Sequence, residues 1–366
     1  MSQDLRVVLL APHRGASGVG DYASDFAAAI APSVREVVEF RHAAPRTASA
    51  REIRSEVRRL RALVTELRRS PGPVVVHAEL SGGAVTAFWG VRALQRDGVR
   101  VTATLHDPPR AVWYPFLTRG VSRGRVLNQA IHRPLHWALE PLERRTLAEV
   151  DLFVLTEPGA AATRRLRIGR SVTTVRHTRP VSVTAATTMP PPVTERPAAV
   201  GLFGHVYTGK GFDLLPDLRR RLPADIALRV AGRGTETLRP VPGVEVLGPL
   251  EADGVAGFFG SIRALLLPYD RPSVGGHEML PCSGTHELAV ALGTPTVALR
   301  STMTEYLATD DLTLLADGGA AGLADAAAAL VTDPAELDRF AAVLARHREL
   351  RSEEDTAEPF LAVWSR

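Results

Sequence analysis

The sequence of 366 residues contains a single cysteine, Cys282, and only 5% aromatic residues. One cysteine excludes a disulfide framework and a cysteine-based metal site. No apolar run approaches the roughly 20 residues that cross a bilayer, and the short run at 5–10 ends before Pro12, unlike a signal peptide. Zinc-finger, RNP and zipper motifs are also missing, which argues against a nucleic-acid partner. We therefore expect a soluble, cytoplasmic protein.

Lysine is scarce, and the net charge of +4 comes from arginine. This balance favours phosphate-bearing or acidic partners, although a genome of high GC content would produce the same excess of arginine. Residues 51–70 combine many arginines with apolar residues at helical spacing. Two interpretations of this basic helix stay open: a peripheral contact with anionic lipid, and a face that is simply solvated.

Apolar runs of strand length alternate with helical patterns in both halves of the chain. This alternation predicts parallel sheets covered by helices on both faces. The expected strands lie at 5–11, 36–40, 73–78, 101–105, 152–155 and 173–176, and then at 198–203, 226–231, 244–247, 264–268 and 296–299.

A proline-rich segment with Pro190, Pro191 and Pro192 interrupts this alternation. We therefore predict an α/β protein of two doubly wound, Rossmann-like domains that face a central cleft. The expected boundaries are 1–189 for the first domain, 190–198 for the linker, 199–348 for the second domain, and 349–366 for a helix that packs back on the first domain.

Two features of the second half predict an anion site. The turn Ser283-Gly284-Thr285 opens a helix, so its free N–H groups and the helix dipole meet at one point. Lys210 follows Gly204 on a glycine-rich loop that is not a Walker loop, because no Ser or Thr follows the lysine. Both features lie at carboxyl ends of expected strands, so we predict that together they bind phosphate.

A third glycine-rich segment follows the first strand. Gly18 and Gly20 begin a GxGxxA pattern, and Glu39 ends the next strand, as in nicotinamide-dinucleotide sites. Residues 12–17 separate the pattern from the strand, however, and Asp21 would repel a pyrophosphate. A dinucleotide oxidoreductase therefore remains only an alternative, and the loop either borders the cleft or forms a tight turn.

Seven segments carry a family resemblance: SGVGDYA at 17–23, TLHD at 104–107, FGHVYTGKGFDLL at 203–215, VAGRG at 230–234, VEVLGPL at 244–250, LLLPY at 265–269 and SGTHELAVALGTPTVA at 283–298. In these segments the chain resembles the GT-B glycosyltransferases, and most of all the family-4 type of retaining, nucleotide-sugar-dependent enzymes. The resemblance implies transfer of a sugar from a nucleoside diphosphate to an acceptor hydroxyl, with retention and without a metal or other cofactor.

The resemblance also implies roles for individual residues. Lys210 would contact the donor diphosphate, and His205 stands where the family has an arginine. His106 would contact the donor sugar near the reacting carbon, and Asp107 would help to orient it. The remaining donor-binding residues implied are Gly18, Gly20, Gly204, Ser283, Gly284, Thr285, Glu278 and Glu287.

One departure concerns the two glutamates that the family places seven residues apart. Here Glu278 and Glu287 are nine residues apart, and the expected second position is occupied by Leu288. A nucleotide-sugar epimerase and a non-catalytic nucleotide-sugar- or carbohydrate-binding protein therefore stay open as alternatives.

The acceptor should bind the first domain. Residues 110–137 mix aromatic and basic side chains, which suits a small-molecule, saccharide or lipid-linked acceptor, the last at the inner face of a membrane. The expected acceptor contacts are His13, His77, Trp113 and Tyr114.

Overall fold

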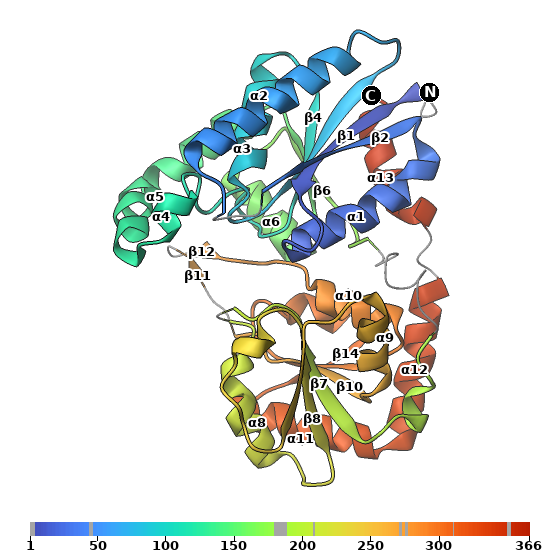
Figure 1. Ribbon diagram of the computed structural model, residues 1–366. Helices are drawn as coiled ribbons and strands as arrows, with labels where there is room; N and C mark the ends of the chain where they lie inside the picture. Colours follow the sequence, from blue (N-terminus) through green and yellow to red (C-terminus); the bar gives the residue numbers. More distant parts are fainter. Residues whose placement is uncertain are drawn as a thin grey trace. The chain divides into compact units, whose positions relative to one another are not determined.

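The computed structural model describes residues 4–43, 47–178, 189–207, 209–270, 273–274, 277–309, 311–349 and 353–366. These form two compact units, each with a six-stranded parallel sheet (Figure 1). Unit 1 comprises Met1–Thr178, Ser273–Cys282 and Glu353–Arg366, and unit 2 comprises Arg179–Pro272 and Ser283–Ser352. The two doubly wound domains expected from the sequence are thus confirmed.

The sheet of unit 1 has the order β2-β1-β3-β4-β5-β6. Its strands are β1 (Arg6–Pro12), β2 (Glu36–His42), β3 (Val74–Leu80), β4 (Val101–Leu105), β5 (Asp151–Val154) and β6 (Ser171–Thr174). Its helices are α1 (Gly18–Ile30), α2 (Ala50–Leu67), α3 (Val85–Arg96), α4 (Arg119–Ser122), α5 (Arg125–Leu147), α6 (Glu157–Leu166) and α13 (Glu353–Trp364).

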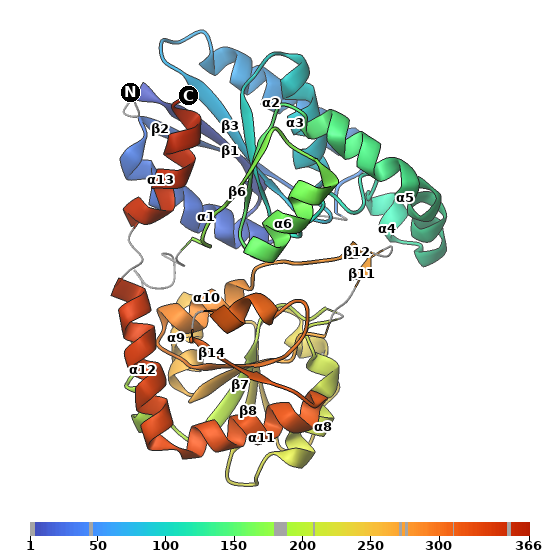
Figure 2. The same cartoon turned by 180° about the vertical axis from the view of Figure 1, so that it is seen from behind.

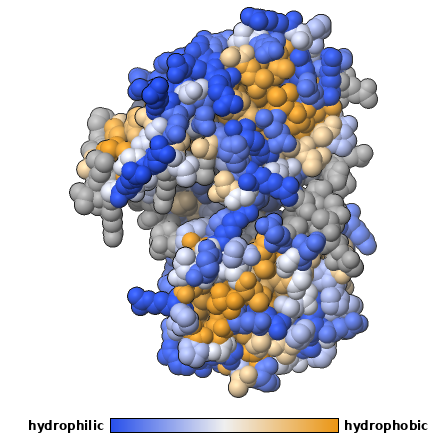
Figure 3. Space-filling view, in the orientation of Figure 1, coloured by the Kyte–Doolittle hydropathy of each residue, from blue (hydrophilic) through white to orange (hydrophobic). Residues whose placement is uncertain are grey.

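Helices cover both faces of this sheet, as the continuous apolar runs predict (Figures 1 and 2). Val8 and Leu10 of β1 pack with α2 and α3, whereas Val7 and Leu9 pack with α1 and α13. The outer side of α2 is strongly hydrophilic (Figure 3), because most of its arginines are exposed.

The sheet of unit 2 has the order β14-β13-β10-β7-β8-β9. Its strands are β7 (Ala199–Phe203), β8 (Ala227–Ala231), β9 (Val244–Gly248), β10 (Ala264–Leu267), β13 (Thr296–Leu299) and β14 (Thr313–Ala316). Its helices include α8 (Leu215–Arg221), α9 (Ala252–Gly260), α10 (Gly284–Ala291), α11 (Gly319–Thr332) and α12 (Pro334–Glu349). The edge strand β14 was not predicted from the sequence.

The segment expected to be a linker is instead part of unit 2 over its described residues. Val193 is buried in the core of this unit. The Arg196 side chain is only 3% exposed and donates to the carbonyls of Phe259, Leu292 and Gly293. These bonds hold the proline-rich segment against α9 and the end of α10, so residues 190–198 are not a free connection.

A second difference concerns the short hairpin of β11 (Ser273–Val274) and β12 (His277–Glu278) and the residues that follow it. These belong to unit 1, although they lie inside the range expected for the second domain. The Leu280 N–H donates to the Pro108 carbonyl at 2.9 Å, and its own carbonyl accepts from the Thr156 hydroxyl at 3.0 Å. The last helix, α13, packs against α1 of the same unit.

Within the described ranges, the helices are too short or too polar to cross a bilayer.

Candidate functional site

The strand order places a topological switch point between β7 and β10 in unit 2. From β7 the chain continues to β8 and β9 on one side, and from β10 to β13 and β14 on the other. Open α/β sheets bind ligands outside the carboxyl ends of strands at such a point. The loop that carries Lys210 follows β7, and the segments that carry Tyr269 and Ser283 follow β10.

Lys210 lies between two aromatic rings. Its Nζ is 3.7 Å from the centroid of the Tyr269 ring and 5.5 Å from that of Tyr207. Among the described residues it forms no ion pair with a carboxylate. Burial alone would lower the pKa of Lys210, but the two tyrosine side chains outweigh burial and raise the pKa above its ordinary value. The ammonium therefore stays charged, and the described part of its unit supplies no counter-ion.

The N-terminus of α10 lies next to this cation. The Tyr269 hydroxyl is 3.2 Å from Ser283 Oγ, which caps the helix by accepting from the His286 N–H at 3.3 Å. The Ser283 N–H itself donates to the Tyr306 hydroxyl. Gly284 is exposed and follows the cap, so the first N–H groups of the helix remain for a ligand.

The β7 loop also reaches α10 directly. Thr285 Oγ1 donates to the Phe203 carbonyl at 3.4 Å, and a Cβ added to Gly204 would meet the same hydroxyl at 3.2 Å. At Gly211 the backbone φ is +75°, and a Cβ would meet Pro268 at 2.4 Å, so only glycine fits there. The structure thus brings together Lys210, Gly204, Ser283 and Thr285, as the sequence led us to expect.

His205 is paired with Arg233, a residue that the sequence-based prediction missed. Arg233 Nη1 donates to His205 Nε2 at 3.1 Å. The loops are also joined through the backbone, because the Val206 N–H donates to the Arg233 carbonyl at 2.9 Å. A guanidinium can only donate, so His205 Nε2 is the acceptor and its proton is on Nδ1. Arg233 therefore supplies a positive charge to this edge, and the VAGRG segment after a strand was the available signal.

The two glutamates of the expected pattern do not form a pair. Glu278 belongs to unit 1 and is exposed. Glu287 is only 7% exposed and lies in the first turn of α10, with its carboxylate 3.7 Å from His286 Nδ1. Glu278 thus lies outside the second domain, where the sequence analysis placed it, and its role in donor binding stays a prediction.

In unit 1 the glycine-rich loop after β1 is held by hydrogen bonds to side chains of the same segment. The Ser17 hydroxyl caps α1 by accepting from the Gly20 N–H at 3.2 Å, and Asp21 accepts from the Gly15 N–H at 2.8 Å. A Cβ at Gly20 would meet the His13 carbonyl at 2.2 Å, whereas Gly18 has open space around it. Gly20 is therefore required for the turn, and only Gly18 is free to meet a ligand.

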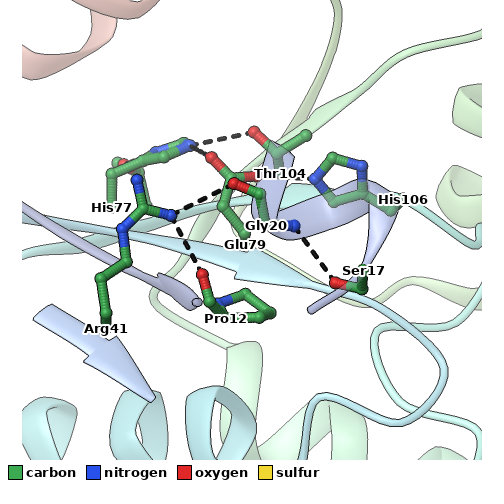
Figure 4. A network of polar contacts seen from close by, with 9 residues as sticks. Pro12, Ser17, Gly20, Arg41, His77, Glu79, Thr104 and His106 are labelled. Atoms are coloured by element: carbon green, nitrogen blue, oxygen red, sulfur yellow. Dashed lines mark hydrogen bonds and ion pairs between the residues drawn. The ribbon is translucent and has the colours of Figure 1, made fainter. Parts of the chain in front are cut away.

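His106, which Figure 4 shows beside Glu79, and Asp107 directly follow β4 and have different surroundings. His106 is 8% exposed, and its Nε2 lies 2.7 Å from Glu79 Oε2. The Asp107 carboxylate accepts from the Gly82 N–H at 2.7 Å and its carbonyl accepts from the Trp113 indole. Asp107 therefore holds the loop after β3 in place, which explains it without a ligand.

Two of the four expected acceptor contacts are buried. His77 is 0% exposed, with its ring nitrogens 2.8 and 2.9 Å from the hydroxyls of Thr102 and Thr104. Trp113 is 4% exposed and packs against Gly82. The expectation that His77 touches an acceptor is wrong, since the rings of α13 cover it. Trp113 also lines the hollow described below, so its contact with an acceptor stays a prediction. His13 is exposed and Tyr114 is half-buried, so these two remain candidates.

A small hollow of about 30 Å³ lies near Tyr114. Its lining residues are mainly apolar: Trp113, Pro115, Phe116, His132, Leu135, Ala138, Leu139 and Leu142. Across the residues whose positions are described, no three His, Cys, Asp or Glu side chains gather closely enough to hold a metal ion.

No protein-family model and no curated protein matches the sequence. Solved structures do match over the whole chain. Anabaena HepE in complex with UDP and glucose aligns at 14% identity over 98% of this chain and 99% of its own, with a TM-score of 0.67. Sucrose-phosphate synthase of Thermosynechococcus elongatus aligns at 14% identity over 99% and 98%, with a TM-score of 0.70.

An alpha-glucosyltransferase in complex with UDP-glucose and DNA aligns at 12% identity over 99% of both chains, with a TM-score of 0.61. At such identities the likeness establishes the fold. The chain has the two Rossmann-like domains of the GT-B glycosyltransferase fold.

Proposed function

We propose that this protein is a glycosyltransferase that moves a sugar from a nucleoside diphosphate sugar to an acceptor hydroxyl, with retention and without a metal ion. Unit 2 would bind the donor and unit 1 the acceptor. The structures with the same fold include complexes with UDP and UDP-glucose, which makes a uridine nucleotide the first donor to test.

The observation that carries the proposal is the ammonium group of Lys210. It is the only lysine in the chain, and it stands at the switch point without a carboxylate partner among the described residues. Arg233 and the N-terminus of α10 add positive charge at the same edge. A diphosphate fits this arrangement better than a neutral or cationic ligand does.

The same groups would also accelerate the transfer reaction. The bond between the anomeric carbon and the diphosphate oxygen breaks, and the acceptor oxygen bonds to that carbon on the same face. The leaving phosphate takes the acceptor's proton, so no carboxylate nucleophile is required. Lys210, Arg233 and the helix N-terminus stabilise the negative charge that develops on the departing diphosphate.

We infer that the acceptor binds near Tyr114, His13 and the aromatic hollow of unit 1. A saccharide, a small molecule or a lipid-linked hydroxyl suits these surroundings. For a lipid-linked acceptor, the exposed arginines of α2 would bring this unit to the inner face of a membrane from the cytoplasm (Figure 3).

The test begins with thermal-shift measurements on UDP-, GDP-, ADP- and dTDP-sugars, since a ligand of the folded state raises the melting temperature. An amine-acylating reagent then modifies the single lysine, and we expect the stabilising nucleotide to protect it. Product analysis with the donor alone separates an epimerase, which would yield a new nucleotide sugar. If no nucleoside diphosphate stabilises the protein or protects Lys210, the proposed function is wrong.

A further inference from the structure

A line of buried polar side chains crosses the α1 and α13 face of the unit 1 sheet. His77 and Glu79 of β3 project to the same face as Thr102 and Thr104 of β4, with which they are in register, and all four are 0% exposed. Figure 4 shows His77, Glu79 and Thr104 of this line. Aromatic rings surround them, including that of Phe360 in α13. Polar groups are costly in such a place unless their hydrogen bonds are satisfied.

The hydrogen bonds of this line can be followed from α13 to Thr104. The indole of Trp364 can only donate, and its Nε1 lies 2.9 Å from Thr102 Oγ1. The Thr102 hydroxyl is then placed to donate to His77 Nδ1 at 2.8 Å. Burial lowers the pKa of His77 to about 4, so the ring is neutral near pH 7 and carries one proton.

That proton belongs on Nε2 of His77. This nitrogen lies 2.9 Å from Thr104 Oγ1, which accepts its N–H, and 3.6 Å from Glu79 Oε1, which has no hydrogen-bond partner among the described residues. The opposite tautomer would turn a lone pair toward Glu79. The neutral His77 therefore contributes a dipole to Glu79 but no charge.

Glu79 consequently relies on His106. Its Oε2 is 2.7 Å from His106 Nε2, and no lysine or arginine among the described residues forms an ion pair with it. A carboxylate only accepts, so Nε2 of His106 carries a proton. The other nitrogen, Nδ1, has no hydrogen-bond partner among the described residues, and the ring keeps 8% of its surface exposed.

We propose that Glu79 is a positioning residue, which holds the His106 ring with Nε2–H toward the carboxylate and presents Nδ1 as an acceptor to a hydroxyl group of the bound substrate. This inference rests on the proposed function, which supplies a polyhydroxylated substrate at this edge. The carboxylate does not touch the substrate; it fixes the tautomer and the orientation of the histidine that does.

The first measurement uses the wild-type chain labelled with ¹⁵N-histidine. The His106 resonances are assigned by their loss in His106→Gln. In the neutral ring we expect one tautomer, with a protonated Nε2 and an unprotonated Nδ1. A His106 that is protonated on Nδ1 overturns the inference, and this result does not depend on any variant being folded.

The second measurement compares Glu79→Gln with Glu143→Gln, which removes the charge of another fully buried glutamate in unit 1. Since an amide both donates and accepts, Glu79→Gln should give a mixture of His106 tautomers and about a 10-fold lower kcat, with an unchanged Kd for UDP. Glu143→Gln should keep the wild-type tautomer. A wild-type tautomer and kcat in Glu79→Gln would contradict the positioning role.

These outcomes separate the two proposals. If UDP and other nucleoside diphosphates do not bind, the proposed function fails, but the tautomer of His106 still reports on Glu79. If UDP binds and sugar is transferred while His106 is protonated on Nδ1, only the role of Glu79 fails.

Discussion

The carboxyl edges of the two sheets have the same topology but different chemistry. In unit 1 the carboxylates of Glu79 and Asp107 bind donors of their own unit, His106 and the Gly82 backbone. In unit 2 the ammonium of Lys210 contacts tyrosine side chains and has no carboxylate partner among the described residues. At this edge, unit 1 pairs its carboxylates with its own donors, whereas unit 2 keeps positive charge for an anion.

The largest effect is expected for Glu143→Ala, which tests whether the buried charges of unit 1 depend on partners within the unit. Glu143 is 0% exposed and accepts from Arg110 at 2.7 Å and from the N–H groups of Ala111 and Val112. Its removal takes away the carboxylate that pairs with the buried guanidinium of Arg110, so we expect a loss of about 3–5 kcal/mol in the free energy of unfolding.

Urea denaturation followed by tryptophan fluorescence measures this loss, because all four tryptophans of the chain lie in unit 1. Glu140→Ala is the matched control: Glu140 is on the same helix, but its ion pair with Arg144 is partly exposed and should contribute less than about 1 kcal/mol. Equal losses in both variants would contradict the predicted dependence on the buried pair.

Acid should weaken unit 1 through its buried histidines. Burial lowers the pKa of His42 and of His77 to about 4, against about 6.5 when unfolded. Between these values the unfolded chain binds more protons, so stability is full above pH 6.5 and falls toward pH 4, by about 3 kcal/mol for each histidine. Melting curves from pH 4 to 7 should have a smaller pH slope in His42→Gln than in the wild type. The exposed His13→Gln serves as control, and a slope unchanged in His42→Gln would refute the assignment.

Lys210→Ala should weaken the binding of UDP to unit 2 with little effect on the stability of the unit. No carboxylate among the described residues loses a partner, so the unfolding free energy should change little, whereas UDP binding should weaken about 100-fold. Calorimetric titration with UDP measures the effect. Arg239→Ala removes an exposed charge from the same unit and should bind as the wild type does. An unchanged Kd in Lys210→Ala would mean that the anion does not bind at Lys210.

Arg233→Gln should have a smaller effect on the same titration. The guanidinium is held by His205 and adds a second positive charge, so its loss should weaken UDP binding about 10-fold. Arg229→Gln, on the strand that leads to this loop, removes a charge that pairs with Glu245 and should leave binding unchanged. Equal effects of both substitutions would indicate a general charge effect instead of a site.

The smallest effects are expected at the two helix caps. Ser283→Ala removes the cap of α10 and Ser17→Ala that of α1, and each should cost about 1 kcal/mol of stability. Hydrogen exchange of the first turn of each helix measures the loss locally. If Ser283→Ala leaves the exchange of the His286 amide unchanged, the capping bond is not formed in solution.

The sequence was informative where local chemistry decides the structure. Continuous apolar runs identify strands that are covered on both faces, and Lys210 and Ser283 could be placed on one sheet edge because parallel strands end together. β14 was missed, although β6, an edge strand of the same length, was predicted. The proline-rich segment was misread, because the carbonyls that bind Arg196 come from distant parts of the chain.

Side-chain pairing was harder to predict. Nothing in the sequence near His77 shows that α13 covers its face of the sheet, so a buried structural histidine was mistaken for an acceptor contact. The pairs Glu79–His106 and Arg233–His205 join residues from different strand ends. Such pairs depend on strand order and register, which the alternation of helices and strands does not determine.

The discontinuous composition of unit 1 has a consequence for its biosynthesis. The ribosome makes the whole of unit 2 before it makes α13, the helix that covers Phe26 and Phe153 of unit 1. Domains generally fold as the chain emerges, the N-terminal one first. Of the two units, the one translated first is completed last, because its aromatic face is covered only once α13 has been made. A nascent chain stalled before residue 353 would leave that face uncovered.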